Sequence, residues 1–251
     1  MRRALVAVSC AVPLVLSVSS ARAQERLGEE HQVILSADRL IPLYSYTVDK
    51  EADLAGTRDS YAESRISLVS GPFSGNNPNG DPDMFNVFDV PRLSFDFTVI
   101  KGLTLGASAI VFFTVGGSHT HTNARTGVET SGDSNSYRLF GVAPRVGYIL
   151  PLGNSNFYFW PRGGISFYSL NIKTAAGGGT FDSDTFTLWA LDFEAPFAFS
   201  PVPHLAFTLG PDADIPLTGS HSSTPAGQGT LPSTDHSQLQ IGVHFGLLAY
   251  F

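Results

Sequence analysis

Residues 238–251 read Gln-Leu-Gln-Ile-Gly-Val-His-Phe-Gly-Leu-Leu-Ala-Tyr-Phe. Every odd position in this stretch is apolar, whereas polar residues or glycine fill the even positions as far as Gly246. A period of two residues is that of a β-strand, whose side chains point to alternate faces. The stretch therefore predicts a strand with one apolar face, and we expect the chain to end on it without a tail.

The end of this stretch resembles the C-terminal signal by which outer-membrane β-barrels are recognised for insertion. That pattern has a polar residue, then glycine two positions on, and hydrophobic or aromatic residues five and seven positions on. His244, Gly246, Ala249 and Phe251 occupy these positions. The resemblance implies a chain that lies in outer-membrane lipid and has the barrel-assembly machinery as a partner. The alternative is an edge strand of a soluble β domain.

The first 23 residues have the layout of a secretory signal peptide. Arg2 and Arg3 precede an apolar run, and Ala21-Arg22-Ala23 supplies small residues at the positions that a signal peptidase reads. We predict cleavage after residue 23, a short lead-in over residues 24–31 and a barrel domain over residues 32–251. The apolar run is shorter than the about 20 residues that a spanning helix needs. Lipid attachment at Cys10 is an alternative.

The composition limits the class of protein. Only 15% of residues are charged, whereas about 25% are charged in a typical soluble domain, so much of the surface should face something other than water. Removing the predicted signal peptide takes away three arginines and the single cysteine, and the formal charge becomes −7 − 3 = −10. Nucleic-acid binding needs clustered Lys and Arg, which an acidic chain lacks. A chain without thiols has neither a disulfide framework nor a thiolate metal site.

Period-two alternation recurs along the chain and predicts eight strands. They cover residues 32–46, 92–99, 103–115, 140–150, 157–167, 188–199, 205–212 and 238–251. The first strand needs a bulge or a change of face near Pro42, because Arg39 shares a face with apolar residues. Trp160 is a candidate for an aromatic girdle.

The connections between these strands alternate in length. Short turns at Lys101 and Gly102, at residues 151–155 and at residues 200–203 close three hairpins. Long loops rich in turn-forming residues are predicted at residues 47–89, 116–136, 172–183 and 217–236. Residues 63–70 look like a strand but would make the count odd, so we place them in the first loop or in a strand extension above the membrane.

An even number of antiparallel strands with short turns on one side and long loops on the other is typical of transmembrane β-barrels. We therefore predict an all-β protein, an eight-stranded antiparallel up-and-down barrel with short periplasmic turns, long extracellular loops and both termini on the periplasmic side. The arrangement resembles the small eight-stranded outer-membrane barrels over essentially all of the mature chain.

If the apolar faces point to lipid, charged residues of both signs point into the lumen. They are Arg92, Asp96, Arg145, Arg162, Asp192, Glu194 and Asp212, and Asp214 and His244 are further candidates. The interior of an eight-stranded barrel is just wide enough for side chains to fill. Buried charges are expensive unless paired, so we predict a salt-bridged plug in preference to an open channel. The alternative interpretation of Asp192 and Glu194 is a pair of catalytic carboxylates.

Other polar clusters give weaker hypotheses. His119 and His121, with His221 and His236, could hold zinc or copper, and the Asn and Asp residues of 76–83 could hold calcium. His221 and Ser223 are two positions apart, as are the catalytic His and Ser of outer-membrane lipid A deacylases. The resemblance to that family is limited to this spacing. We expect no catalytic residues, no metal and no cofactor.

The leading hypothesis is a non-enzymatic, monomeric outer-membrane barrel that acts in envelope structure or surface interaction through its outer loops. An extracellular protein or surface ligand would then be the partner of those loops. Three alternatives remain. They are a lipid A deacylase-like enzyme, a small-solute pore, and a secreted lipocalin-like barrel that would need apolar residues inside and polar residues outside.

Overall fold

The computed structural model describes residues 26–52, 57–68, 86–114, 117–122, 125–133, 135–153, 156–177 and 180–251. The predicted signal peptide and the Asn- and Asp-rich residues 76–83 lie outside these ranges. Within them, no helix has both the length and the apolar character needed to cross a membrane.

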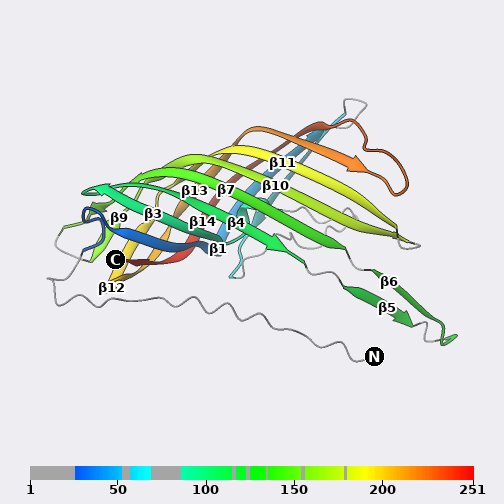
Figure 1. Cartoon of the computed structure of the whole chain (residues 1–251), viewed down its shortest axis with the longest axis horizontal. Coiled ribbons are helices and arrows are strands. Elements are labelled where there is room, and N and C mark those ends of the chain that lie inside the picture. The colour runs from blue at the N-terminus through cyan, green and yellow to red at the C-terminus, as the bar shows by residue number, and fades with distance from the viewer. Residues whose placement is uncertain are drawn as a thin grey trace.

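Eight long strands form a closed antiparallel ring, which confirms the predicted fold class. In chain order they are β1 (Val33–Ala52), β3 (Arg92–Ile100), β4 (Leu103–Phe113), β7 (Ser136–Tyr148), β10 (Arg162–Gly177), β11 (Thr180–Glu194), β13 (Leu205–Thr224) and β14 (Thr234–Tyr250). The first and last strands of the ring pair with each other, with Ile34 opposite Tyr250. Figure 1 shows the strands tilted along an elongated barrel.

Short turns lie at one end of the barrel, together with the C-terminus (Figure 1). Lys101 and Gly102 join β3 to β4 as the predicted two-residue turn. Gly102 has a φ of 83° there, a conformation that residues with a Cβ rarely adopt. Following the convention for this architecture, we call the short-turn end periplasmic and the opposite end outer.

Three short strands continue the wall at the periplasmic end. They are β8 (Leu150–Pro151), β9 (Phe157–Phe159) and β12 (Phe197–Val202). They extend β7, β10 and β11 and pair in the same order, β8 with β9 and β9 with β12. The breaks beside β10 and β11 fall at Pro161 and Pro196, which have no N–H to donate to the ladder, and the break between β7 and β8 falls at Ile149.

The outer end differs from the prediction. The segments predicted as loops 172–183 and 217–236 consist mostly of paired strand, because β10 and β11 pair up to Gly177 and Thr180, and β13 reaches Thr224. Their outward face is polar, so the apolar period that reveals the wall strands is missing from it, whereas Ile172 and Phe186 pack inward against the buried apolar side chains.

The two remaining predicted loops also contain strands. The loop 116–136 carries the hairpin of β5 (Ser118–Thr122) and β6 (Glu129–Asp133), which projects beyond the barrel in Figure 1. In the first loop, β2 (Arg58–Arg65) pairs with the outer part of β1, Ser45 opposite Arg65. The strand-like piece predicted near residue 63 is therefore an extension of a hairpin and adds no ninth strand to the ring.

Apolar side chains point out of the barrel and polar ones point in. Large apolar side chains remain exposed on the wall, for example Leu93 at 71% and Phe113 at 62%, whereas Arg92 and Asp96 are buried. The exposed band runs from the level of Tyr148 and Phe207 to that of Phe113, Trp189 and Ile241. This is the facing of a transmembrane barrel and the reverse of a lipocalin.

One detail of facing corrects the sequence interpretation, and a second gives the predicted bulge its position. Trp160 is fully buried in the lumen, where its ring nitrogen donates to Thr104 at 3.1 Å, so it belongs to no girdle. The bulge of β1 lies between Ala37 and Ile41, slightly before Pro42, with a second irregularity after Pro42. It turns Arg39 inward, beside Asp38, which already faces the lumen, and Arg39 adopts a φ of 56°.

Candidate functional site

The middle of the lumen holds a layer of arginines and carboxylates. The arginines are Arg39, Arg92, Arg145 and Arg162, and the carboxylates are Asp38, Asp96, Asp192, Glu194, Asp212 and Asp214. No side chain of this layer is more than 7% exposed. Charges buried this deeply are stable only when they are paired and hydrogen-bonded.

Arg39 is the centre of one half of this layer. Its guanidinium lies 2.6 Å from Asp214 and 3.1 Å from Asp192. Glu194 lies 3.2 Å away and Asp212 3.5 Å away. One residue from the β1 bulge thus joins carboxylates of β11 and β13 across the lumen.

The other arginines link the remaining strands. Arg92 contacts Asp192 and lies 3.2 Å from Asp214. Arg145 lies 2.7 Å from Asp38 and 2.5 Å from Asp96. The layer therefore ties together side chains from β1, β3, β7, β11 and β13.

The seven residues predicted for the lumen all lie in this layer. Arg162, for example, lies 2.6 Å from Glu194. Sequence reasoning missed Asp38, although it alternates regularly with the buried Ile34 and Ser36. It left Arg39 on the outer face, because only the bulge brings Arg39 inward. His244 and Asp214, the further candidates, also face the lumen, where His244 contacts Asp212.

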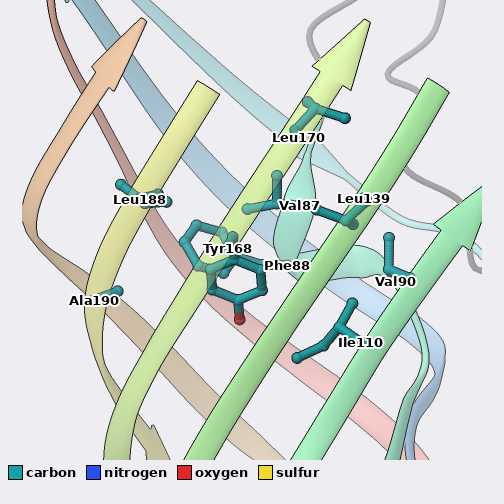
Figure 2. Close-up of a cluster of buried hydrophobic side chains, with 9 residues drawn as sticks. All are labelled: Val87, Phe88, Val90, Ile110, Leu139, Tyr168, Leu170, Leu188 and Ala190. Atoms are coloured by element: carbon teal, nitrogen blue, oxygen red, sulfur yellow. The ribbon is translucent and has the colours of Figure 1, made fainter. Parts of the chain in front are cut away.

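A turn of the first loop closes the lumen on the outer side of the charged layer. The 3-10 helix η1 (Val87–Asp89) starts after Asn86, whose side chain accepts a hydrogen bond from the Phe88 amide at 3.0 Å. Phe88 is fully buried and packs edge-on against Tyr168, with ring centroids 5.2 Å apart. Figure 2 shows the side chains of this turn among those of the wall strands, including Leu170 and Leu188.

Polar contacts anchor the same turn. The Asp89 carboxylate is fully buried and lies 2.6 Å from the Arg65 guanidinium of β2. It also accepts hydrogen bonds from Gln240 at 3.0 Å and from Ser45 at 3.1 Å. The predicted first loop thus supplies part of the interior, a role that its sequence does not reveal.

A second apolar cluster fills the periplasmic end of the lumen. It comprises Leu27, Ile34, Ile149, Tyr158, Trp160, Ala198, Ala206, Leu248 and Tyr250. Leu27 comes from the predicted lead-in and is 3% exposed, so this segment folds into the barrel mouth. The described lumen therefore contains an apolar layer, a charged layer and a second apolar layer in series.

The space left within the charged layer is small. A cavity lined by Asp38, Arg39, Arg162, Glu194, Thr208 and His244, among others, has a volume of about 20 Å³. That volume holds roughly one water molecule. This cavity thus has no room for a continuous water column.

His221 and His236 lie at the outer mouth, beyond the apolar band, where His236 lies 3.1 Å from Asp49. The ring nitrogens of His221 contact the carboxylates of Glu51 and Asp184, the latter at 3.3 Å, and its ring stacks on Phe186 at 4.1 Å. Burial lowers the pKa of His221, but the hydrogen bond and charge of Glu51, followed by those of Asp184, raise it above its usual value overall. The hydrogen bond from His221 lowers the pKa of Glu51. His221 and Glu51 therefore both stay charged over a wider pH range than they would apart. Together with Asp184 they tie β1 to β11 and β13.

The same geometry bears on the weaker site hypotheses. Both nitrogens of His221 are engaged by carboxylates inside the mouth, an arrangement that differs from a His paired with a Ser on a barrel strand. Among the described residues, no group of three or more His, Cys, Asp or Glu is placed to hold a metal ion. The side chains of His119 and His121 lie outside the description.

The four residues of the predicted assembly signal lie on β14 or directly after it. His244 and Gly246 face the lumen, and Ala249 and Phe251 face outward. A Cβ added to Gly246 would meet the Thr208 hydroxyl at 2.6 Å, so glycine allows close approach there. The Phe251 backbone pairs with Val33 through two hydrogen bonds of 2.9 Å, and its side chain is 49% exposed.

Comparison with known proteins gives structural likeness only. No protein-family model and no curated protein matches the chain. Among solved structures it is similar to the outer membrane protein OprG from Pseudomonas aeruginosa, at 14% identity over 89% of this chain and 99% of that chain, with a TM-score of 0.48. It is also similar to the outer membrane protein AlkL in lipid bilayers, at 12% identity over 93% and 96%, with a TM-score of 0.47. For the outer membrane protease OmpT from Escherichia coli, the identity is 8% over 92% and 100%, with a TM-score of 0.40.

Proposed function

We propose that this protein is an integral outer-membrane β-barrel that is closed to solutes and acts in envelope structure or surface interaction through its outer strand extensions. The observation that carries the proposal is the series of three layers in the lumen. The apolar layers, which include Trp160 and Phe88, lie on either side of the charged layer around Arg39. A solute would have to displace all three.

We expect purified protein in planar bilayers to show no large, stable conductance, because neither a water column nor a ring of single-sign charge crosses the lumen. The measurement is single-channel current over a range of voltages. Phe88→Ala serves as the matched variant and should also be silent, since the charged layer remains below the turn. Steady openings from the unaltered monomer would refute the closed lumen and favour the small-solute pore.

The outer extensions support the second half of the proposal. From Thr180 to Leu188, β11 continues beyond the exposed Trp189 of the apolar band. Nine residues of strand correspond to about 30 Å. A cysteine at Thr126, between β5 and β6, should react with an impermeant thiol reagent on whole cells, whereas a cysteine at Lys101 should not. Labelling at Lys101 and not at Thr126 would show that the barrel has the opposite orientation.

The engagement of His221 supports a non-enzymatic role over the deacylase alternative. A general base needs a ring nitrogen within reach of the proton that it removes. Glu51 and Asp184 contact both nitrogens of this imidazole. The arrangement suits a structural tie at the mouth.

We further propose that His244, Gly246, Ala249 and Phe251 form the recognition signal for the barrel-assembly machinery. The exposure of Phe251, 49%, at the end of the chain beside the short turns supports this proposal. Deleting Phe251 should lower the amount of folded protein in the outer membrane several-fold, measured by the difference in gel mobility before and after boiling. A change at the loop residue Thr126 should have no such effect, and equal amounts after both changes would contradict the assignment.

A further inference from the structure

The outer wall carries a groove that the closed lumen does not explain. It spans β4, β7 and β10 near the outer edge of the apolar band and is lined chiefly by Val111, Phe113, Arg138, Phe140, Ser169 and Asn171. Its volume is about 610 Å³, within the range of about 300–1,000 Å³ that is usual for ligand sites. Because these side chains face outward, the groove opens toward lipid.

The strand register arranges the groove in two rows. In the lower row, Phe140 lies opposite Val111 on one side and Ser169 on the other. Val111 is 57% exposed and Phe140 is 56% exposed, so this row offers an apolar surface without a protein cover. A surface of this kind at membrane depth suits an acyl chain.

The upper row places a cation at the end of that surface. Arg138 lies opposite Phe113 and Asn171, and Lys173 follows two residues after Asn171 on the same face. Both cations are exposed, and no ion pair between described residues includes either of them. The carboxylate of nearby Asp184 belongs to the lumen side, where it contacts His221. Two cations thus lie just above an apolar groove.

We propose that this groove binds a phosphorylated, acylated lipid of the outer leaflet, with an acyl chain on Val111 and Phe140 and a phosphate on Arg138 and Lys173. Guanidinium groups bind phosphate through paired, charge-assisted hydrogen bonds. The depth of the site agrees with this occupant, because Arg138 lies at the top of the apolar band, where lipid headgroups begin. A second copy of the chain would not supply the phosphate that these cations select.

The test is a binding isotherm of the folded barrel in detergent with diphosphoryl lipid A, followed by native mass spectrometry. Each cation near a membrane surface contributes about 1 kcal/mol, so Arg138→Gln with Lys173→Gln should weaken binding about thirtyfold. Lys101→Gln, at the periplasmic turn, is the matched control and should bind like the unaltered protein. Gel mobility before and after boiling establishes that each variant is folded.

Two further arms separate the sources of phosphate and the role of the groove. Lipid A without phosphates should bind the unaltered protein about as weakly as the double variant binds diphosphoryl lipid A, and inorganic phosphate should not compete. Val111→Trp, which fills the groove, should weaken the binding of both forms of lipid A. Equal affinity of the double variant and the unaltered protein, binding independent of phosphate, competition by free phosphate, or occupancy by a second copy would each overturn the proposal. The layers of the lumen lie on the other side of the wall, so the conductance result is independent of this outcome.

Discussion

Replacing Arg39 with methionine is expected to lower the free energy of unfolding by about 3–5 kcal/mol, the usual cost of removing one partner from a buried charge cluster. Arg39 lies within 3.5 Å of four carboxylates and its side chain is 2% exposed. Methionine fills a similar volume but leaves Asp192, Asp212 and Asp214 facing one another without their shared cation. The measurement is denaturant unfolding of the barrel reconstituted in vesicles.

Lys101→Gln provides the control for this prediction. The side chain of Lys101 is 75% exposed and lies 3.5 Å from Glu29, itself 46% exposed. An exposed ion pair contributes about 0–1 kcal/mol. Adding Asp214→Asn to Arg39→Met should recover part of the loss, since it removes one of the carboxylates that lost Arg39 and leaves Arg92 to the others. An unchanged stability of Arg39→Met would show that the charged layer does not hold the strands together.

The wall of the barrel could be predicted from the sequence because each of its strands has one face toward lipid and one toward a polar lumen. The first predicted hairpin, residues 92–99 and 103–115, corresponds closely to β3 and β4. The same alternation placed Arg92, Asp96 and Arg145 inside. The reason is physical, since a single-residue slip would move every charge of a strand into lipid.

The centre of the charged layer could not be predicted in the same way. In a regular strand Arg39 would lie on the same face as the outward-facing Leu35, four residues earlier. Only the bulge before Ile41 turns it inward. Nothing in the composition of β1 fixes where that bulge lies. Asp89 and Phe88 belong to a non-repeating turn, so no periodicity marks them as interior residues.

The outer strands were missed for a different reason. Between Thr180 and Phe186 the residues are mainly polar or small on both faces, since neither face contacts lipid. Long cross-strand pairing therefore continues without the apolar signal. The loop prediction failed where the membrane ends, which itself marks the outer limit of the apolar band.

An arginine in place of Val142 is expected to lower the free energy of unfolding in vesicles by about 2–4 kcal/mol, the cost of a cation at the bilayer midplane on the lipid face of a barrel. Val142 lies halfway along the outward face of β7, between Phe140 and Val146, and is 39% exposed. Its cross-strand neighbours are Ala109 and Phe167, and neither offers a partner for a charge. The measurement is again denaturant unfolding after reconstitution.

The same strand supplies the control, because it carries a native arginine four residues nearer the outer edge. Arg138 lies where the cost of a charge falls to about 0–1 kcal/mol, so Arg138→Val alone should change stability little. Exchanging the two residues keeps the composition and alters only the depth of the charge, and this double variant should be as unstable as Val142→Arg. If water surrounded the wall, as in a secreted lipocalin-like barrel, both single variants would stay within about 0.5 kcal/mol of the unaltered protein. Depth dependence along one face of one strand therefore separates a barrel in lipid from a barrel in water.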